Sequence, residues 1–257
     1  LNISKTLPRN KGTVIVKHAN PCGVSASNSK IQSFKLALKC DPLSAFGGIV
    51  SCNFKIKRKL ANELNKIFLE VIIANGFDKD SLKILKSKKN LRLIDASKIN
   101  LNNLMDFTSI NNGILTQTQD RIKITKNNLK IVSKRKPNKK QLEDLIFALN
   151  VCRFVKSNAI VLVNNKSTVG IGSGQPSRLD SCKIAINKMK KLTNIKNDVV
   201  AASDAFFPFV DGIEKLVQSG VTAVIQPFGS LNDDEIIKFA NNTDTILAFS
   251  KTRHFKH

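Results

Sequence analysis

Residues 13–53, TVIVKHANPCGVSASNSKIQSFKLALKCDPLSAFGGIVSCN, contain the patterns of a strand, a helix and a second strand in succession. Alternating β-branched side chains predict a buried strand over 13–18, and Pro and Gly predict a turn over 19–23. Apolar residues at helical spacing predict a helix over 29–39, and a second strand is expected at 49–51. Strands that alternate with helices are typical of an α/β protein.

The same alternation continues to the end of the chain, with one weak region. Residues 96–140 are rich in Asn and Lys and show little periodicity. We therefore expect two α/β units, over 1–135 and 136–257. Two pairs of short matches, VIVKHAN with RFVKSNA and DPLSAFGGIV with SDAFFPFVDGI, agree with a duplication, although the spacing between them differs in the two halves.

The composition excludes several classes of protein. The 257 residues carry 42 Lys and Arg against 19 Asp and Glu, a formal net charge of +23. Trp and Tyr are absent and the basic residues are scattered, so a lysine-rich solvated surface is favoured over a nucleic-acid groove. No window contains the roughly 18 uncharged apolar residues of a membrane span. The five cysteines form no Cys-x-x-Cys pair, which favours a cytoplasmic protein over a disulfide framework.

Lys17 and His18 are the first candidates for chemistry, at the end of the first predicted strand. A neighbouring Lys disfavours the protonated imidazole and so keeps a histidine neutral, as a general base requires. The alternative is that the two side chains point to opposite faces of the strand and share no site.

Three later stretches are also candidates. Residues 170–181, GIGSGQPSRLDS, precede a predicted helix and contain Arg178, so they either receive an anion or use small residues for clearance. Residues 203–212 place three Phe around Pro208, either beneath a flat ligand or within the core. Residues 227–230, PFGS, form a turn that either caps a helix or meets a ligand.

A zinc nucleoside deaminase is tested by its motif. That class needs a His or Cys with a nearby Glu, followed by Pro-Cys-x-x-Cys. Here Pro21-Cys22 is followed by Gly-Val-Ser, and no Glu lies near His18. We therefore expect no metal site.

The motifs together resemble the AICAR transformylase domain of the bifunctional purine biosynthesis (PurH) family, in order and over nearly the whole chain. The motifs that carry the resemblance are VKHANPCGVS, DPLSAFGGIV, VKSNAIVLV, GIGSGQPSRLDS, SDAFFPFVDGI, QPFGS and the closing RHFKH. The resemblance implies two tandem cytidine-deaminase-like three-layer α/β units without the deaminase zinc site.

The implied activity is formyl transfer from 10-formyltetrahydrofolate to the 5-amino group of AICAR, an imidazole carboxamide ribonucleotide, in purine (IMP) biosynthesis. By resemblance, His18 is the proton acceptor, and Lys17 orients the substrate and stabilises the transition state. Asn158 contacts the substrate near the reacting centre, and His257 assists. A weakly nucleophilic amine must lose its proton as the tetrahedral oxyanion forms, which explains the need for such groups.

The resemblance also implies two sets of binding residues. The nucleotide contacts are Gly76, Asp95, Arg178, Phe206 and Arg253. The folate-side contacts are Leu179, Asp211 and Ser230. A homodimer with active sites shared between the subunits is implied as well, and so is a structural monovalent cation near residues 152–158 and Asp204.

The chain departs from the family pattern in two ways. It opens on Leu1, and the phosphate-holding Arg-Tyr-Gly-Glu-Asn-Pro segment that precedes KHANPCG in the family is missing, so we expect a piece of a longer protein. The cyclohydrolase domain is missing too, and no cyclohydrolase activity is expected. Besides the transferase, the charge keeps a second hypothesis open: a nucleotide- or RNA-binding module that has lost catalysis. A zinc deaminase, the third, would require bound metal.

Overall fold

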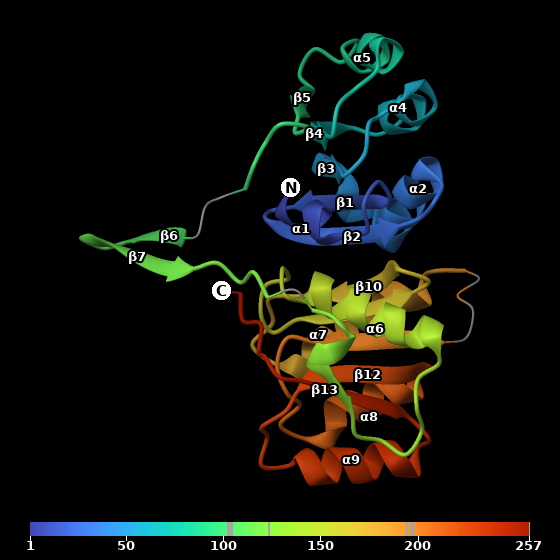
Figure 1. The fold of residues 1–257 in the computed structure, drawn as a ribbon, viewed down its shortest axis with the longest axis vertical. Helices are drawn as coiled ribbons and strands as arrows, with labels where there is room; N and C mark the ends of the chain where they lie inside the picture. The colour runs from blue at the N-terminus through green and yellow to red at the C-terminus, as the bar shows by residue number, and fades with distance from the viewer. Residues whose placement is uncertain (102–104, 123, 194, 196–197, 257) are drawn as a thin grey trace.

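The structure is a computed structural model that describes residues 1–101, 105–122, 124–193, 195 and 198–256. Within these residues the chain forms one mixed sheet of eleven strands and a separate two-stranded hairpin (Figure 1). In sheet order the strands are β5 (Arg92–Asp95), β4 (Leu69–Ala74), β3 (Gly48–Cys52), β1 (Gly12–Lys17), β2 (Asn20–Ala26), β10 (Ser167–Gly172), β9 (Ile160–Asn164), β11 (Val199–Ser203), β12 (Val221–Pro227), β13 (Ile246–Ser250) and β8 (Leu129–Ile131). The expected α/β class is confirmed.

The strand order repeats in the two halves of the sheet. β1 pairs antiparallel with β2 and β3, and β3, β4 and β5 are parallel. In the second half β9 pairs antiparallel with β10 and β11, and β11, β12 and β13 are parallel. The helices follow the same order: α2 (Lys30–Cys40) and α7 (Arg178–Lys190), α4 (Arg58–Asn65) and α8 (Val210–Gln218), and α5 (Lys79–Leu85) and α9 (Asp233–Asn242). A helix also precedes each hairpin, α1 (Asn2–Thr6) and the longer α6 (Lys139–Cys152).

The sequence matches do not follow this structural repeat. Lys17 ends β1, whereas Lys156 precedes β9, and Asp41 precedes β3, whereas Asp204 follows β11. The predicted turn over residues 19–23 was also wrong, because Asn20–Ala26 is strand β2 and the turn is only two residues long. Pro21 is accommodated at a β-bulge, where the register shifts.

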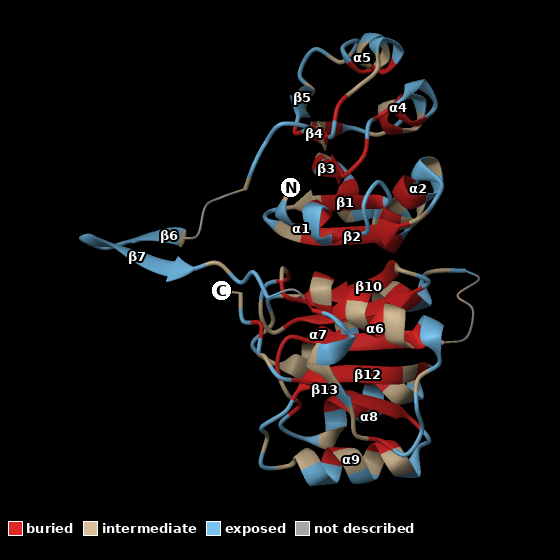
Figure 2. Cartoon of the chain, in the orientation of Figure 1, coloured by how far each residue is buried: buried red, intermediate tan, exposed pale blue. Residues whose placement is uncertain are grey.

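The core lies in layers on the two faces of the sheet (Figure 2). One apolar cluster joins α6 to the central strands, through Leu145 and Leu149 for example. A second cluster, which contains Phe207, joins α7, α8 and α9 to the opposite face. A third, around Phe34 and Phe54, joins α2, α4 and α5 to the first half.

The two halves meet where β2 lies beside β10. Ser25 pairs with Ser167, the amide of Ala26 donates to the carbonyl of Lys166 (2.9 Å), and the amide of Val24 donates to Oγ1 of Thr168 (2.9 Å). An ion pair between Asp41 and Lys188 (2.8 Å) adds a contact between the halves from outside the sheet. The halves therefore form one continuous body.

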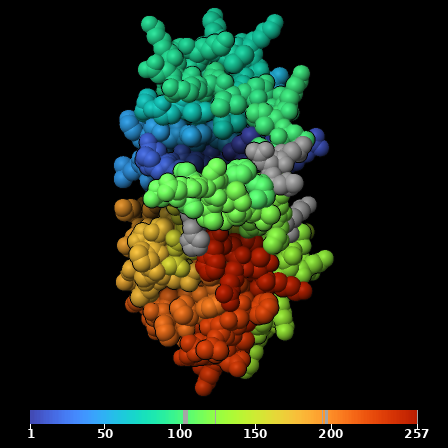
Figure 3. Space-filling model, turned by 90° about the vertical axis from the view of Figure 1, so that its left-hand side faces the viewer, coloured from blue at the N-terminus to red at the C-terminus, as the bar shows by residue number. Residues whose placement is uncertain are grey.

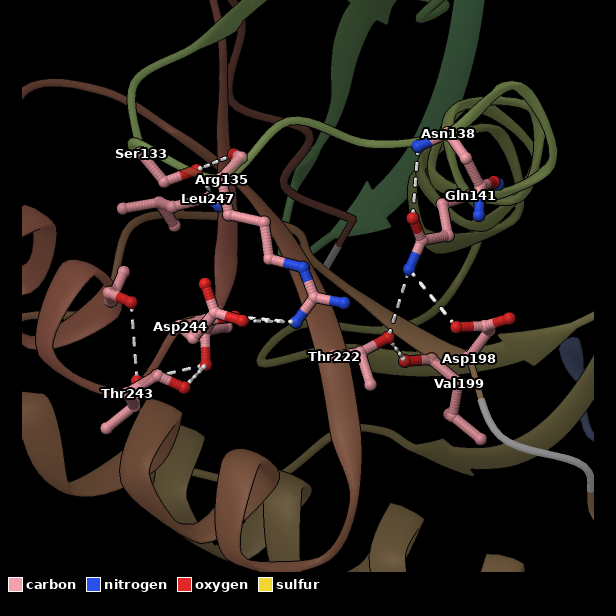
Figure 4. A network of polar contacts seen from close by, with 12 residues as sticks. Ser133, Arg135, Asn138, Gln141, Asp198, Val199, Thr222, Thr243, Asp244 and Leu247 are labelled. Carbon is pink, nitrogen blue, oxygen red and sulfur yellow. Dashed lines mark hydrogen bonds and ion pairs between the residues drawn. The ribbon is translucent and has the colours of Figure 1, made fainter.

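The segment before α6 is fastened to the second half (Figure 4). The amide of Leu247 donates to Oγ of Ser133 (2.8 Å), and Arg135 pairs with Asp244 (3.0 Å). Asn138 and Gln141 form a capping box at the start of α6. These contacts lie at the edge where β12 and β13 begin.

Glycines of β10 let α7 approach the sheet closely. A Cβ at Gly172 would lie 1.9 Å from the carbonyl oxygen of Ser181, and one at Gly170 would lie 2.1 Å from that of Ala185. Gly23 has the same relation to Ala37 of α2 (1.9 Å). For residues 170–172 the clearance interpretation is therefore confirmed.

We expect Gly172→Ala to destabilise the protein by about 1–3 kcal/mol, because backbone of α7 must move to admit the methyl group. Urea unfolding followed by circular dichroism measures the change. Gly113→Ala is the matched control, since its nearest contact would be an ordinary 3.7 Å from Ile110. A Gly172→Ala variant as stable as the control would contradict the close approach of α7.

All five cysteines are buried: Cys22, Cys40, Cys52, Cys152 and Cys182. Burial raises the pKa of Cys22, Cys52 and Cys182 to about 12 and that of Cys40 to about 11. We expect the native protein to leave a thiol reagent such as DTNB unconsumed for minutes at pH 7.5, and all five thiols to react in denaturant. Rapid reaction of the native protein would contradict this packing.

Among the helices that the structure describes, none combines the length and the apolar composition that a membrane-spanning helix needs.

The hairpin β6 (Met105–Ile110) and β7 (Gly113–Thr118) projects from the body (Figure 1). Every residue of β7 is exposed, and so is every residue of β6 except Met105. The sequence GILTQTQ, residues 113–119, is strand-like and predicts β7, but it does not predict that the hairpin projects.

Candidate functional site

His18 occupies a strained turn between β1 and β2. His18 (φ 50°) and Ala19 (φ 59°) are both in the left-handed region, as a two-residue type I′ turn requires. Asn-Gly and Asp-Gly are the sequences that favour such turns, and neither is present; His is enriched in the left-handed region, whereas Ala is not. The imidazole is exposed at the tip. Non-glycine residues in this conformation carry a backbone cost, and such residues cluster at functional sites when nothing local stabilises them.

The equivalent turn of the second half shows the ordinary solution. Asn165 and Lys166, both at φ 53°, join β9 to β10. Asn favours the left-handed region, and the carboxylate of Asp144 accepts hydrogen bonds from both turn amides (2.8 and 2.7 Å). The His18 turn has no such sequence, so stability alone does not explain its residues.

Lys17 is held at the same edge of the sheet. Its Nζ donates to the carbonyls of Phe46 and Gly47, both at 3.0 Å. Lys17 and His18 belong to one turn, but no contact between their side chains is formed among the described residues. The turn is tied to the second half by Asn20, which accepts from the amide of Lys156 (3.0 Å) and donates to Ser173 (3.3 Å).

Asn158 lies two residues beyond that tie. Its side-chain amide donates to the carbonyls of Gln175 and Pro176 (2.8 and 2.9 Å), and its own carbonyl accepts from Oγ of Ser181 (2.7 Å). These bonds orient Asn158 against the loop that precedes α7.

Asp204 connects three of the predicted positions. The carboxylate is fully buried and pairs with Arg178 (2.9 Å), whose side chain is 11% exposed. Oγ of Ser157, the neighbour of Asn158, donates to the other carboxylate oxygen. The amide of His254, the neighbour of Arg253, donates to the carbonyl of Asp204 (2.9 Å). Arg178 also donates to Oγ of Ser203 (3.0 Å) and to the carbonyl of Phe206 (3.2 Å).

Arg253 and Phe206 form a cation–π pair beside this network. The guanidinium carbon lies 4.6 Å from the centre of the ring. His254 points inward, is 1% exposed, and places Nδ1 2.5 Å from Oδ2 of Asp120. Burial is the largest influence on the pKa of Asp120 and raises it, but the hydrogen bond and charge of His254, the amide of Ile122 and the charge of Arg153 together outweigh burial, so the pKa is lowered.

The folate-side positions follow strand ends at the same edge of the sheet as Arg178. Leu179 is half-buried in the first turn of α7, Asp211 is exposed in the first turn of α8, and Ser230 follows β12. Phe209 and Phe228 are 63% and 54% exposed close to them in the chain. Because Phe209 and Phe228 are exposed, they fit the alternative in which these residues lie beneath a ligand. Phe207 is buried and fits the other alternative, a place in the core.

Gly76 and Asp95 lie elsewhere. β4 and β5 begin at the edge where β1 ends, so the residues at their carboxyl ends lie at the opposite edge. Six strand-to-strand steps separate β4 from β11, which at about 4.8 Å a step is about 29 Å. A Cβ at Gly76 (φ 96°) would lie 4.0 Å from Oδ2 of Asp95, so these two positions stay together. The single chain does not bring them to Arg178.

Two further predictions concern His257 and metal. His257 lies outside the described residues. Over the described ranges, no three His, Cys, Asp or Glu side chains lie close enough together to hold a metal ion. The donor set of a zinc deaminase is not assembled there.

Some residues of this network were missed at the sequence level. Ser157, Asp120 and His254 carry no recognised motif role, and Asp204 was singled out only as a neighbour of a cation. The signal that would find them is pairing between residues far apart in sequence, which a single sequence does not contain. A cavity of about 700 Å³ lies between the end of α1 and α6 and contains none of the predicted site residues.

The geometry defines an α/β protein whose polar, arginine-containing site lies at the strand ends, where such folds bind anionic ligands. The chain belongs to the AICARFT/IMPCHase bienzyme family, whose model matches residues 2–188.

The relatives in that family are named bifunctional purine biosynthesis protein PurH. The chain is 49% identical over 247 residues to the protein of Buchnera aphidicola subsp. Schizaphis graminum, a match that covers 95% of this chain and 47% of the relative. It is 43% identical over 258 residues to the protein of Leptospira biflexa, covering 100% of this chain and 50% of the relative. It is 45% identical over 252 residues to the protein of Rhodospirillum rubrum, covering 95% and 48%. The chain therefore spans about half the length of the curated relatives it matches.

Proposed function

We propose that this chain performs the formyltransferase half of the family's chemistry: transfer of the formyl group from 10-formyltetrahydrofolate to the 5-amino group of AICAR. The observation that carries the proposal is the turn at His18. An exposed imidazole stands in a left-handed turn, which is costly for Ala19, and the turn is tied through Asn20 to the segment before Asn158. The relatives are bifunctional, and the cyclohydrolase activity is not expected from this chain.

His18 is the general base of the proposed reaction. The amine nitrogen attacks the formyl carbon and His18 accepts the proton that the amine loses. The bond from the carbon to N10 of the folate then breaks as the same proton passes from His18 to N10, which leaves His18 neutral again. The ammonium of Lys17, fixed by two carbonyls, stabilises the developing oxyanion and orients the substrate. Asn158 contacts the substrate near the reacting centre, and His257 assists.

The binding roles divide between two copies of the chain. Arg178, Phe206 and Arg253 bind the nucleotide, supported by the network around Asp204. Leu179, Asp211 and Ser230 bind the folate. Because Gly76 and Asp95 lie at the opposite sheet edge, they serve the nucleotide bound by a second copy in a homodimer.

The finer description of the fold belongs to the same proposal. The repeated strand order supports two cytidine-deaminase-like units, over 1–135 and 136–257, as descendants of one duplicated unit. The buried carboxylate of Asp204 and the carbonyls of residues 152–158 are the place for a structural monovalent cation. The protein acts in the cytoplasm, on small molecules.

The test is formyl transfer, followed as tetrahydrofolate absorbance with AICAR and 10-formyltetrahydrofolate. It is run on this chain and on this chain joined to the unmatched part of the Buchnera relative, with AICAR binding measured by calorimetry on both. Turnover by either protein supports the proposal. Binding without turnover in both would favour the alternative of a nucleotide-binding module, to which the +23 charge also points. Bound zinc by elemental analysis would favour the deaminase.

A further inference from the structure

We infer that the β6–β7 hairpin is an arm that docks onto a second copy of this chain. The inference rests on the homodimer of the proposed function, and it names the segment that makes the contact.

The hairpin has no partner of its own in the described part of the chain. Each strand pairs only with the other, and both outer edges are open. An isolated two-stranded hairpin is at best marginally stable in water, and open strand edges invite pairing with another chain. In Figure 3, where the side from which the arm projects faces the viewer, the arm stands in front of the level at which the two halves meet.

Apolar side chains are exposed on both faces of the arm. Phe107 (69% exposed) and Ile114 (68%) lie on one face, and Ile110 (54%) and Leu115 (56%) lie on the other. A hairpin that covered its own body would need only one apolar face. Apolar residues on both faces fit an arm held between two surfaces, as where two copies meet.

The distribution of charge also favours a second copy of the chain as the partner of the arm. Each copy carries +23, so two copies repel unless the contact avoids the basic residues. Residues 105–118 contain no Lys or Arg, although the chain has 42 of them in 257 residues, and their one charged residue is Asp106. The arm is thus the segment of the chain best suited to approach another copy.

Each end of the arm is close in sequence to one of the two sets of predicted site residues. It begins ten residues after Asp95, at the end of β5. It ends two residues before Asp120, whose carboxylate contacts His254 beside Arg253. One end of the arm is therefore connected to Asp95 and the other to the residues around Arg253, two sets of site residues that lie far apart in the single chain. Docking of the arm on a second copy would hold both sets in place.

The first experiment compares molar mass by sedimentation velocity. The wild-type chain is expected at twice its 28.4 kDa, and the double variant Phe107→Asp/Ile114→Asp at 28.4 kDa. Phe107→Leu/Ile114→Val is the matched control and should remain a dimer. A second variant replaces residues 105–118 by a short Gly-Ser linker, which tests the arm without adding charge. Circular dichroism checks that the body of each variant is folded.

The second experiment identifies the contact directly. Because the natural cysteines are buried, Asn111→Cys at the exposed tip supplies one accessible thiol for a maleimide–diazirine cross-linker. In a mixed sample of ¹⁴N and ¹⁵N chains, cross-linked peptides that combine both isotopes show contact between copies. Cross-links confined to one isotope would overturn the inference.

The outcomes separate the arm from the proposed function. A monomeric wild-type chain, or aspartate and linker variants that both stay dimeric, would overturn the arm. If the dimer persists without the arm, the inference about the arm fails but the proposed function does not. Formyl transfer and AICAR binding are measured separately, on the wild-type protein. Loss of the dimer in both variants, with retention in the Leu/Val control, supports it.

Discussion

His18→Asn is expected to lower kcat/KM for formyl transfer by about 100-fold or more while leaving the fold intact or more stable. Asn removes the imidazole but favours the left-handed conformation that position 18 adopts, at φ 50°. The substitution therefore separates the chemistry of the side chain from the geometry of the turn. Steady-state kinetics and thermal unfolding of the same preparation measure the two effects.

Ala19→Gly is the matched control for the turn. Ala19 (φ 59°) is also in the left-handed region, so glycine should stabilise the protein by about 1 kcal/mol. Since His18 is unchanged, formyl transfer should stay within a few-fold of wild type. His18→Asn with near wild-type turnover would show that another group takes the proton. Equal loss in both variants would show that the rigidity of the turn, rather than the imidazole, supports catalysis.

Local sequence patterns predicted most strands and helices of this fold because their apolar periodicity is strong. Residues 13–18 and 49–51 overlap observed strands, and residues 29–39 overlap helix α2. The prediction was wrong for Asn20–Ala26, where Pro and Gly look like turn residues. There the glycine serves the approach of α2 and the proline lies at a bulge, and both reasons depend on neighbours in space.

The candidate site was predicted in part for a similar reason. Motifs located Lys17, His18 and Arg178, because each lies in a short stretch with a recognisable composition. The contact between Asp120 and the buried His254 joins residues 134 positions apart, so no local pattern contains it. The separation of Gly76 from Arg178 follows from sheet topology, which a list of motifs does not provide.

Asp204→Leu is expected to destabilise the protein by about 3–5 kcal/mol, the largest stability effect that the site offers. The carboxylate is fully buried, and its removal leaves the 11%-exposed guanidinium of Arg178 without its charge partner. Ser157 also loses its acceptor. Urea unfolding measures the change, and calorimetry should show weaker AICAR binding, since Arg178 is no longer held in place.

Two further variants decide whether the ion pair acts in stability or in binding. Asp180→Asn removes a comparable contact with Lys183 (3.0 Å), but both side chains are about half exposed, so the expected loss is at most about 1 kcal/mol. In Arg178→Met/Asp204→Leu both charges are gone, and replacing a buried pair by apolar groups often restores stability. We expect that double variant to regain most of the stability lost by Asp204→Leu and none of the AICAR affinity. If affinity returned with stability, Arg178 would be a structural residue, and the nucleotide would have to be held by Arg253 and Phe206 instead.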